Sequence, residues 1–333
     1  MSDEKKLNKL IDEAQRIVVI QADNPDGDSL GSAIALEQIL TDLGKDARLF
    51  CAVDIPKHLR YLTGWSRVSN DLQSDFDLSI VVDTSAVSLL EKIKGSDLAT
   101  LKRKPLVILD HHISPSSIDF AELTINRPAV ATGEIIYDLA KELDWHLNNE
   151  AKDMIAISIL SDSLGLMTVA TTAHSIRIIA DLVEGGVNLT HLDNLRRSSY
   201  RKSPELTAYK GQLLGRIENY LDDRLALLTI PWSEIEKYSP LYNPPMLVME
   251  DMRLIENNAI SVALKSYKDG HLTAKIRSNE GYPLSAKLAE HFGGGGHDFS
   301  SGFKTSDYSL EDLKKEIISI TAELLKGVKN EAI

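Results

Sequence analysis

Short apolar runs alternate with segments of helical periodicity through the first half of the chain. Four runs rich in Val, Ile or Leu have the composition of buried strands: residues 16–22, 47–53, 76–83 and 105–110. Apolar residues recur at helical spacing in the segments between and after them, at 29–43, 131–143 and 151–160. Gly44 follows the first of these segments and predicts its end. Strands that alternate with helices predict an α/β fold with a doubly wound, mostly parallel sheet.

The pattern changes near residue 200, where several basic residues gather among serines. We interpret residues 196–206 as a linker between a first domain, 1–195, and a second, smaller α/β domain, 207–333. Beyond the linker, the sequence predicts a helix over 205–221, strands at 224–231, 259–265 and 272–276, and helices over 285–291 and 310–328.

Length and composition agree with two globular domains. The chain has 333 residues, of which 43% are hydrophobic and 26% charged, and its formal net charge is −12. This acidic balance argues against broad binding to duplex DNA, but it leaves room for short oligonucleotides or nucleotides in a local pocket. With one cysteine, Cys51, no intramolecular disulfide can form. No apolar stretch reaches the length of a membrane span, and the charged start does not resemble a signal peptide, so we expect a cytoplasmic protein.

The fourth apolar run ends directly in Asp110, His111 and His112. Active sites of open α/β sheets collect at the carboxyl ends of the strands, so this motif is a candidate metal site at that edge. The alternative is a polar loop that happens to contain two histidines.

Acidic residues also stand at other strand and helix ends. Asp26 and Asp28 flank Gly27 after the first strand, Asp83 ends the third, and Asp162 follows the helix over 151–160. Each has an alternative role in capping a helix, but four such acids beside two histidines favour metal binding. Mixed nitrogen and oxygen ligands suit Mn²⁺, Co²⁺ or Zn²⁺ better than Ca²⁺. The ligands suffice for two ions sharing a carboxylate, the usual arrangement for phosphoester cleavage.

A second cluster lies in the C-terminal domain and consists of Gly293, Gly294, Gly295, Gly296 and His297. Consecutive glycines can present backbone N–H groups to an anion, although such a run is also typical of a flexible loop. Arg277 and Ser278, which follow a predicted strand, strengthen the phosphate hypothesis because a guanidinium can bind phosphate through two donors. Neither a P-loop nor a nucleophile elbow is present.

Taken in order, these motifs resemble the DHH phosphoesterase superfamily, in the branch of nano-RNases, 3′-phosphoadenosine-5′-phosphate phosphatases and cyclic-dinucleotide phosphodiesterases. The resemblance rests on five segments and covers nearly the whole chain: residues 24–28, 82–85, 110–112, 161–163 and 293–297. It implies a DHH catalytic domain, a DHH-associated substrate-binding domain, two divalent ions, most naturally Mn²⁺ with Co²⁺, Mg²⁺ or Zn²⁺ as alternatives, and a possible homodimer.

The resemblance also implies roles for individual residues. Asp26 and Asp83 would hold one metal, and Asp28, Asp83, His111 and Asp162 the other. Asp110 would orient His111, and His112 would contact the scissile phosphate. Arg277, Ser278 and residues 293–297 would hold the far end of the substrate.

One position departs from the family pattern. The first motif of the family usually begins with a histidine four residues before the first aspartate, and that position is Ala22 here. Gln21 or Asp23 could compensate. A weak or substrate-recruited first metal, a one-metal site and lost catalysis are the three alternatives.

These observations predict a metal-dependent phosphohydrolase that acts on short oligoribonucleotides, linear or cyclic dinucleotides, or 3′-phosphoadenosine 5′-phosphate. A pyrophosphatase or polyphosphatase is the alternative enzyme. A non-catalytic nucleotide-binding protein is the alternative outside enzymes, because of Ala22.

Overall fold

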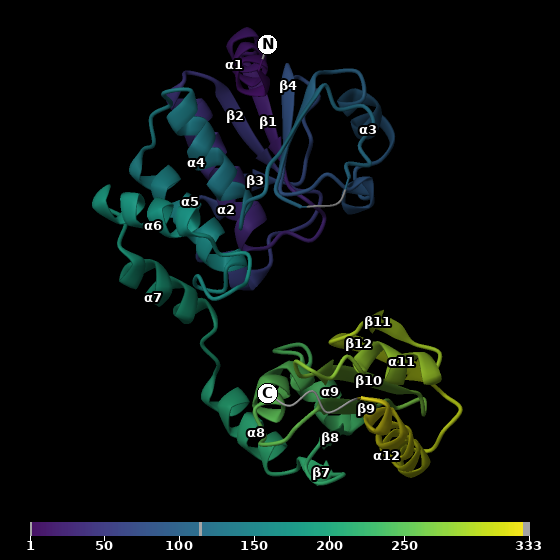
Figure 1. Ribbon diagram of the computed structural model, residues 1–333. Coiled ribbons are helices and arrows are strands. Elements are labelled where there is room, and N and C mark those ends of the chain that lie inside the picture. Colours follow the sequence, from purple (N-terminus) through teal and green to yellow (C-terminus); the bar gives the residue numbers. More distant parts are fainter. Residues whose placement is uncertain (1, 113–114, 329–333) are drawn as a thin grey trace. The chain divides into compact units, whose positions relative to one another are not determined.

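The computed structural model describes residues 2–112 and 115–328 and divides the chain into two compact units (Figure 1). The division lies between Arg201 and Lys202. It falls in a short non-helical stretch between two helices, α7 (Leu189–Ser199) and α8 (Pro204–Leu214). The predicted linker, 196–206, therefore includes the last turn of one helix and the first turn of the next.

The N-terminal unit contains a six-stranded parallel sheet in the order β3-β2-β1-β4-β5-β6. This confirms the predicted doubly wound fold. The chain builds outward from β1 in one direction and then returns to add strands from β4 in the other. The strands are β1 (Arg16–Ile20), β2 (Asp46–Phe50), β3 (Val68–Ser69), β4 (Leu78–Val82), β5 (Leu106–Asp110) and β6 (Leu123–Asn126).

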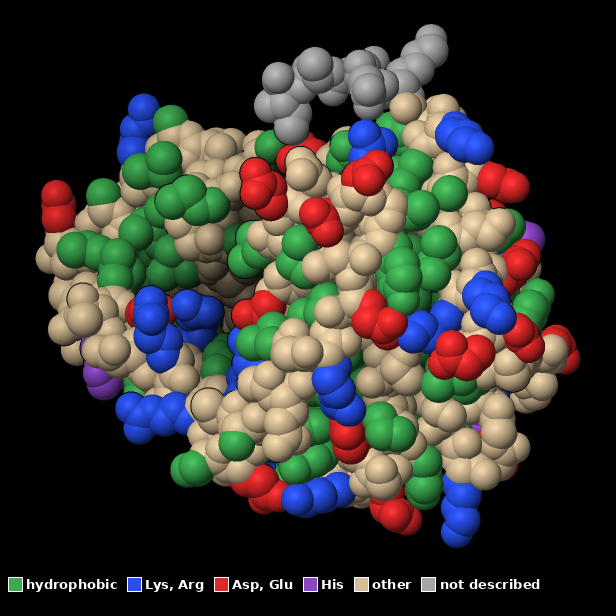
Figure 2. Space-filling view, turned by 90° about the horizontal axis from the view of Figure 1, so that it is seen from below, with side chains coloured by type: hydrophobic (Ala, Val, Ile, Leu, Met, Phe, Trp, Pro, Cys, Tyr) green, Lys and Arg blue, Asp and Glu red, His purple; other side chains and the backbone are tan. Residues whose placement is uncertain are grey.

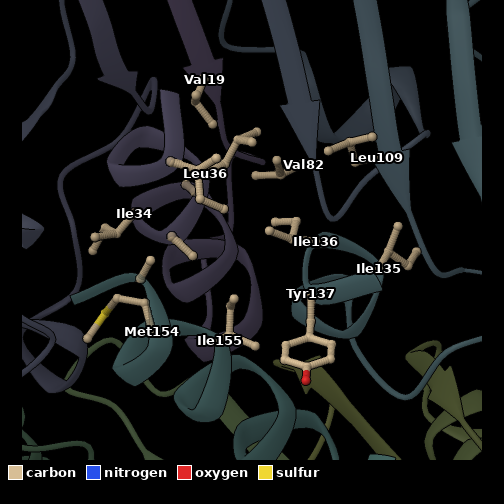
Figure 3. Close-up of a cluster of buried hydrophobic side chains, with 14 of the residues drawn as sticks. Val19, Ile34, Leu36, Val82, Leu109, Ile135, Ile136, Tyr137, Met154 and Ile155 are labelled. Atoms are coloured by element: carbon tan, nitrogen blue, oxygen red, sulfur yellow. The ribbon is translucent and has the colours of Figure 1, made fainter. Parts of the chain in front are cut away.

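Helices cover both faces of this sheet. Alternate strand residues, such as Val19 and Val82, pack with the larger group of helices into one core, in which Ile136 and Ile155 come from α4 and α5 (Figure 3). The intervening residues, such as Val81, pack into a second core on the face beside α3. The helices of this unit are α1 (Asp3–Glu13), α2 (Gly27–Asp42), α3 (Gly95–Leu101), α4 (Thr132–Glu142), α5 (Asn149–Asp162), α6 (Ala173–Glu184) and α7, with short 3-10 turns at Lys57–Leu59, Trp65–Arg67 and Val87–Leu90.

The C-terminal unit contains a mixed six-stranded sheet in the order β11-β12-β10-β9-β8-β7. Only the β8–β9 pair is parallel. The strands are β7 (Glu218–Tyr220), β8 (Leu225–Ile230), β9 (Ile260–Ser266), β10 (Leu272–Ser278), β11 (Gly295–His297) and β12 (Ser300–Thr305). The helices are α8, α9 (Trp232–Tyr238), α10 (Met249–Arg253), α11 (Ser285–His291) and α12 (Leu310–Gly327), with a 3-10 turn at Pro244–Leu247.

Two sequence predictions in this unit were wrong. The helix expected over 205–221 ends at Leu214 because Gly215 closes it, and residues 218–220 instead form the edge strand β7. The glycine run expected to be a loop forms β11 over its second half, where Gly295 and Gly296 pair with Gly302 and Ser301.

Acidic, basic and hydrophobic side chains are interspersed on the molecular face drawn in Figure 2. Within residues 2–112 and 115–328, no helix combines the length and the apolar character needed to cross a bilayer.

Candidate metal centre

The predicted acidic residues lie at the carboxyl edge of the parallel sheet, where the order of strand addition reverses between β1 and β4. Crevices at such switch points are where open α/β sheets bind ligands. The loop after β1 carries Asp26 and leads into α2, and Asp83 directly follows β4. Asp83 has a φ of 59°, a left-handed conformation that costs energy for a non-glycine residue. The strand ends at this backbone turn, which Asp83 itself forms.

Asp28 is fully buried where α2, α4 and α5 meet. Its Oδ1 accepts hydrogen bonds from Ser158 Oγ at 2.6 Å and Ser32 Oγ at 2.8 Å, and its Oδ2 accepts one from Thr132 N at 2.8 Å. Both oxygens of this buried carboxylate therefore have hydrogen-bond donors. Because the partners come from three helices, the position of this carboxylate is fixed by the fold.

His111 points its Nε2 at three carboxylates. The distances from that atom are 3.5 Å to Asp28 Oδ2, 3.4 Å to Asp83 Oδ1 and 3.6 Å to Asp162 Oδ2. On the other side of the ring, Nδ1 lies 3.2 Å from the carbonyl oxygen of Ala129. A carbonyl can only accept, so Nδ1 is the donor to it and Nε2 is the ring atom that faces the carboxylates.

This arrangement fits a divalent cation. Nε2 of His111 is buried and has no hydrogen-bond partner among the described residues. Carboxylates held this close together need a positive charge among them, and imidazole nitrogen with carboxylate oxygen is a ligand set of transition metals. Two groups of side chains bring ligand atoms close enough to share an ion: Asp28, His111 and Asp162, and Asp83, His111 and His112.

The pKa shifts of the acidic residues also indicate that this site needs a cation. Burial raises the pKa of Asp83 well above its usual value, and the charges of Asp28, Asp26 and Asp162 raise it further. Burial likewise raises the pKa of Asp162 to about 7, with Asp28 and Asp26 contributing. The pKa of Asp26 is also raised, mainly by burial. The fold thus holds together carboxylates that repel one another without a cation.

Asp110 does not orient His111 as the family resemblance implied. Its Oδ1 instead accepts a hydrogen bond from Nδ1 of His112 at 2.7 Å and one from the His112 backbone N–H at 3.2 Å. Alternate residues of an extended chain point to the same side, so a carboxylate at 110 reaches residue 112 rather than 111. The hydrogen bond that His112 donates to Asp110 raises the pKa of His112. Burial by itself would raise the pKa of Asp110, but its hydrogen bonds with His112 and Ser85 outweigh burial and lower it.

Asp26 caps α2, since its Oδ1 accepts a hydrogen bond from Ser29 N at 2.9 Å. It lies outside the two ligand groups, although its charge acts on Asp83 and Asp162. The neighbouring Asp23 binds the backbone N–H of Lys92 through Oδ2 at 2.8 Å. Ala22 is buried, and the Gln21 side chain is fully buried, with no hydrogen-bond partner among the described residues for either amide atom.

Comparison with known proteins agrees with this geometry. Residues 16–171 match the family model described as the DHH family, N-terminal domain. The chain therefore contains a DHH family domain within its N-terminal unit. It is 26% identical over 306 residues to a bifunctional oligoribonuclease and PAP phosphatase of Thermus thermophilus, covering 91% of this chain and 88% of that protein. A protein of the same description from Bacillus subtilis is 24% identical over 292 residues, covering 86% and 88%. An exopolyphosphatase-related protein from Bacteroides fragilis has the same fold, with a TM-score of 0.78 at 21% identity over 97% of both chains.

The C-terminal unit carries a cationic hollow of about 680 Å³ on its sheet. Its lining includes Arg277 and the backbone of residues 294–296, as the sequence suggested. It also includes Lys265, Lys275 and Lys304, which sequence reasoning missed. The sequence could have indicated this cationic surface. Lys275 and Arg277 are two residues apart on one strand, so their side chains share a face.

Other predicted residues of this unit are placed differently. Ser278 lies on the opposite face of β10, where its buried Oγ hydrogen-bonds Ser285 Oγ at 2.8 Å. The amides of Gly293 and Gly294 donate to the carbonyls of Glu290 and Ala289 at the end of α11. The glycine run therefore does not present four free N–H groups in succession, because a helix end and a strand pairing use part of them. His297 is exposed in β11.

Proposed function

We propose that this chain is a divalent-metal-dependent phosphoesterase that hydrolyses short oligoribonucleotides and 3′-phosphoadenosine 5′-phosphate. The observation that carries the proposal is the convergence of Asp28, Asp83 and Asp162 on Nε2 of His111. The names of the Thermus and Bacillus relatives support this substrate class.

The four residues of this convergence would hold one ion, and Asp26 and Asp83 would hold a second. We propose Mn²⁺ for both, because imidazole and carboxylate together suit it. When bound, divalent ions supply Lewis-acid stabilisation of phosphoryl charge and activate the attacking water. The hydrogen bonds from three helices to Asp28 fix the ligands before substrate arrives, so the centre needs little reorganisation.

His112 is placed to handle a proton. Its Nδ1 is bonded to Asp110 and its side chain is 54% exposed, so Nε2 is open to a ligand. The hydrogen bond to Asp110 raises the His112 pKa, so the imidazolium persists closer to neutral pH. We infer that His112 binds a phosphoryl oxygen and donates its Nε2 proton as the leaving oxygen gains charge.

The cationic hollow of the C-terminal unit supplies phosphate binding. Within the described residues, Lys265, Lys275, Arg277 and Lys304 form no ion pair with an acidic side chain. Burial lowers the pKa of both Lys265 and Lys275, and the next cation along the face lowers each further. Unpaired, mutually repelling cations on an acidic protein favour a polyanionic ligand.

A hydrolysis panel tests the proposed function. We expect Mn²⁺-dependent release of mononucleotide from a 5′-phosphorylated diadenylate and of phosphate from 3′-phosphoadenosine 5′-phosphate, measured by chromatography. Pyrophosphate belongs in the same panel, because its exclusive turnover would show the alternative enzyme. Ala22→His should lower the Mn²⁺ concentration needed if the missing ligand limits metal affinity.

The matched variants are Asp83→Asn, in the centre, and Asp269→Asn, on an exposed turn of the C-terminal unit with a side chain 72% exposed. The first should lose hydrolysis and the second should retain it. Wild-type turnover by Asp83→Asn, or inactivity of the wild type on every substrate with Mn²⁺, Co²⁺ and Mg²⁺, would overturn the proposal.

A further inference from the structure

A second hollow, of about 500 Å³, lies within the N-terminal unit and is mainly apolar. The walls include Leu160 from α5, Leu189 and Leu192 from α7, and Leu59 from the first 3-10 turn. Apolar concavities of this size, with a few polar groups, are typical of sites for small organic ligands. None of its lining residues belongs to the metal-ligand set described above.

The hollow adjoins the metal centre. Gly27 and Ser161 line it, and each directly precedes a ligand, Asp28 and Asp162. At this point α2 and α5 pack closely, since a Cβ on Gly27 would lie 2.3 Å from Ser161 Oγ, so the same two segments line the hollow and carry Asp28 and Asp162. A ligand whose phosphate reaches the carboxylates could therefore place an attached ring in this hollow.

The polar groups of the hollow suit a neutral ring better than a second phosphate. Arg196 is the only cation of the lining, and its Nη2 and Nε donate to Asp193 Oδ1 at 2.8 and 3.2 Å. Burial raises the pKa of the Tyr61 phenol to about 12, so the phenol is uncharged. Tyr61 and Tyr200 give the lining two aromatic rings, and nucleobases stack on such rings whatever their sequence.

The lip of the hollow shows an independent sign of ligand binding. Leu164 lines the hollow, yet its side chain is 75% exposed. The backbone is left-handed at Leu164, Gly165 and Leu166, with φ of 49°, 76° and 70°. Leu164 in this strained conformation keeps an apolar side chain exposed to solvent at the edge of the hollow, a combination that clusters at ligand sites.

We propose that this hollow binds a nucleobase of the substrate and so selects nucleotides over phosphoesters that lack a base. The inference rests on the proposed function, since it assigns the organic part of the ligand whose phosphate the centre receives. Stacking on Tyr61 and burial against Leu189 and Leu160 would provide the recognition.

The test compares two ligands that share a phosphate and differ in the base, adenosine 5′-monophosphate and ribose 5-phosphate. Isothermal titration with Mn²⁺ present should give about tenfold tighter binding of the adenosine nucleotide by the wild type. Leu189→Trp, which fills the hollow, and Tyr61→Leu, which removes a ring, should each reduce this ratio to below about threefold. Ribose 5-phosphate should bind all three proteins equally.

Tyr61→Phe should bind like the wild type, because it keeps the ring. Leu254→Trp is the matched control, since Leu254 is 85% exposed in the other unit and lines neither hollow. Equal binding of the two ligands by the wild type, or an unchanged ratio in Leu189→Trp and Tyr61→Leu proteins with native melting temperatures, would overturn the inference.

These titrations need no turnover, so they separate the two proposals. Base-dependent binding without hydrolysis of any substrate would refute the phosphoesterase function and keep the pocket. Hydrolysis together with equal binding of the two ligands would support the phosphoesterase function and refute the nucleobase pocket.

Discussion

At the scale of single residues, activity and stability make opposite demands on Asp83. Its side chain is 7% exposed, it stands in a left-handed conformation, and three other carboxylates act on its charge. Without a cation, the folded state favours the protonated form of this residue, as its raised pKa indicates. Metal binding requires the charged form.

Asp83→Asn should therefore separate the two properties. We expect hydrolysis to fall at least about 100-fold, since even residues that only support metal ligands commonly cost 10–100-fold. The free energy of unfolding of the metal-free protein should increase, because a neutral amide at this buried position is not repelled by the neighbouring carboxylates. Urea denaturation in EDTA measures this change.

The variant Asp75→Asn should change the free energy of unfolding in the opposite direction. The pKa of Asp75 is lowered by its hydrogen bond with Arg48, so its neutral variant should lose stability instead. A metal-free Asp83→Asn protein less stable than the wild type would contradict the account of carboxylate repulsion.

Some residues of the metal centre, and some of their contacts, could be predicted from the sequence. The sequence indicated Asp28, Asp83, His111 and Asp162 because each stands at the start or end of an apolar element. A polar side chain that is buried there costs free energy unless it has a partner or binds a ligand. The pairing of Asp110 with His112 was accessible from strand alternation, which outweighs the proximity of Asp110 to His111 in sequence. The hydrogen bonds of Ser158 to Asp28 depend on how α2 and α5 pack and could not be predicted from either segment alone.

At the scale of elements, close helix contacts hold the centre together. Gly133 is the second residue of α4, and its N–H donates to Ser158 Oγ of α5 at 2.9 Å. A Cβ at this position would lie 2.2 Å from the same oxygen. Any side chain must push apart the two helices whose residues bind Asp28.

We expect Gly133→Ala to destabilise the protein by about 1–3 kcal/mol, as overpacking does, and to weaken Mn²⁺ binding. Urea denaturation and metal titration measure the two effects. Gly211→Ala is the control, because Gly211 lies within α8 with no atom within 4 Å of its added Cβ. This variant should gain about 0.5–1 kcal/mol from helix propensity. Equal stability of the two variants would contradict the proposed packing constraint.

The strands of the C-terminal unit lead to a second prediction for elements. Lys275 and Lys304 stand on adjacent strands of the cationic hollow, so neutralising both as glutamine should raise KM for a trinucleotide and reduce its dependence on salt. Lys268→Gln with Lys287→Gln removes the same charge outside the hollow and should leave KM nearly unchanged. Steady-state kinetics at two salt concentrations decide the matter, and equal effects of the two double variants would exclude a specific phosphate surface.

Helices and strands were predicted correctly where the apolar residues follow one clear periodicity. The prediction failed where contacts with a distant segment decide the structure. The alternation of β1, β4 and β5 with helices gave the parallel sheet. The glycine run at 293–296 has no apolar pattern, and its strand character comes from pairing with Ser301 and Gly302 of β12. Such pairing at the edge of a sheet depends on the partner strand.

At the scale of the whole molecule, metal binding and folding are linked through pH. The pKa of Asp162 is raised to about 7 and that of Asp83 is raised well above its usual value. In the unfolded chain both groups titrate near 3.8. Because the folded-state pKa is the higher one, the stability from their protonated forms is complete below the unfolded value. It is lost as pH rises through the folded value.

The metal-free wild type should therefore lose stability relative to Asp162→Asn between about pH 4 and pH 7. Comparing the two proteins cancels the contributions of the other carboxylates, several of which act in the opposite direction. Mn²⁺ should raise the melting temperature of the wild type more at pH 7 than at pH 5, because the ion replaces protons at the centre. Thermal unfolding in EDTA and in Mn²⁺ across this range gives both differences. A difference between the two proteins that stays constant with pH would show that the carboxylates of the centre do not couple its protonation to the fold.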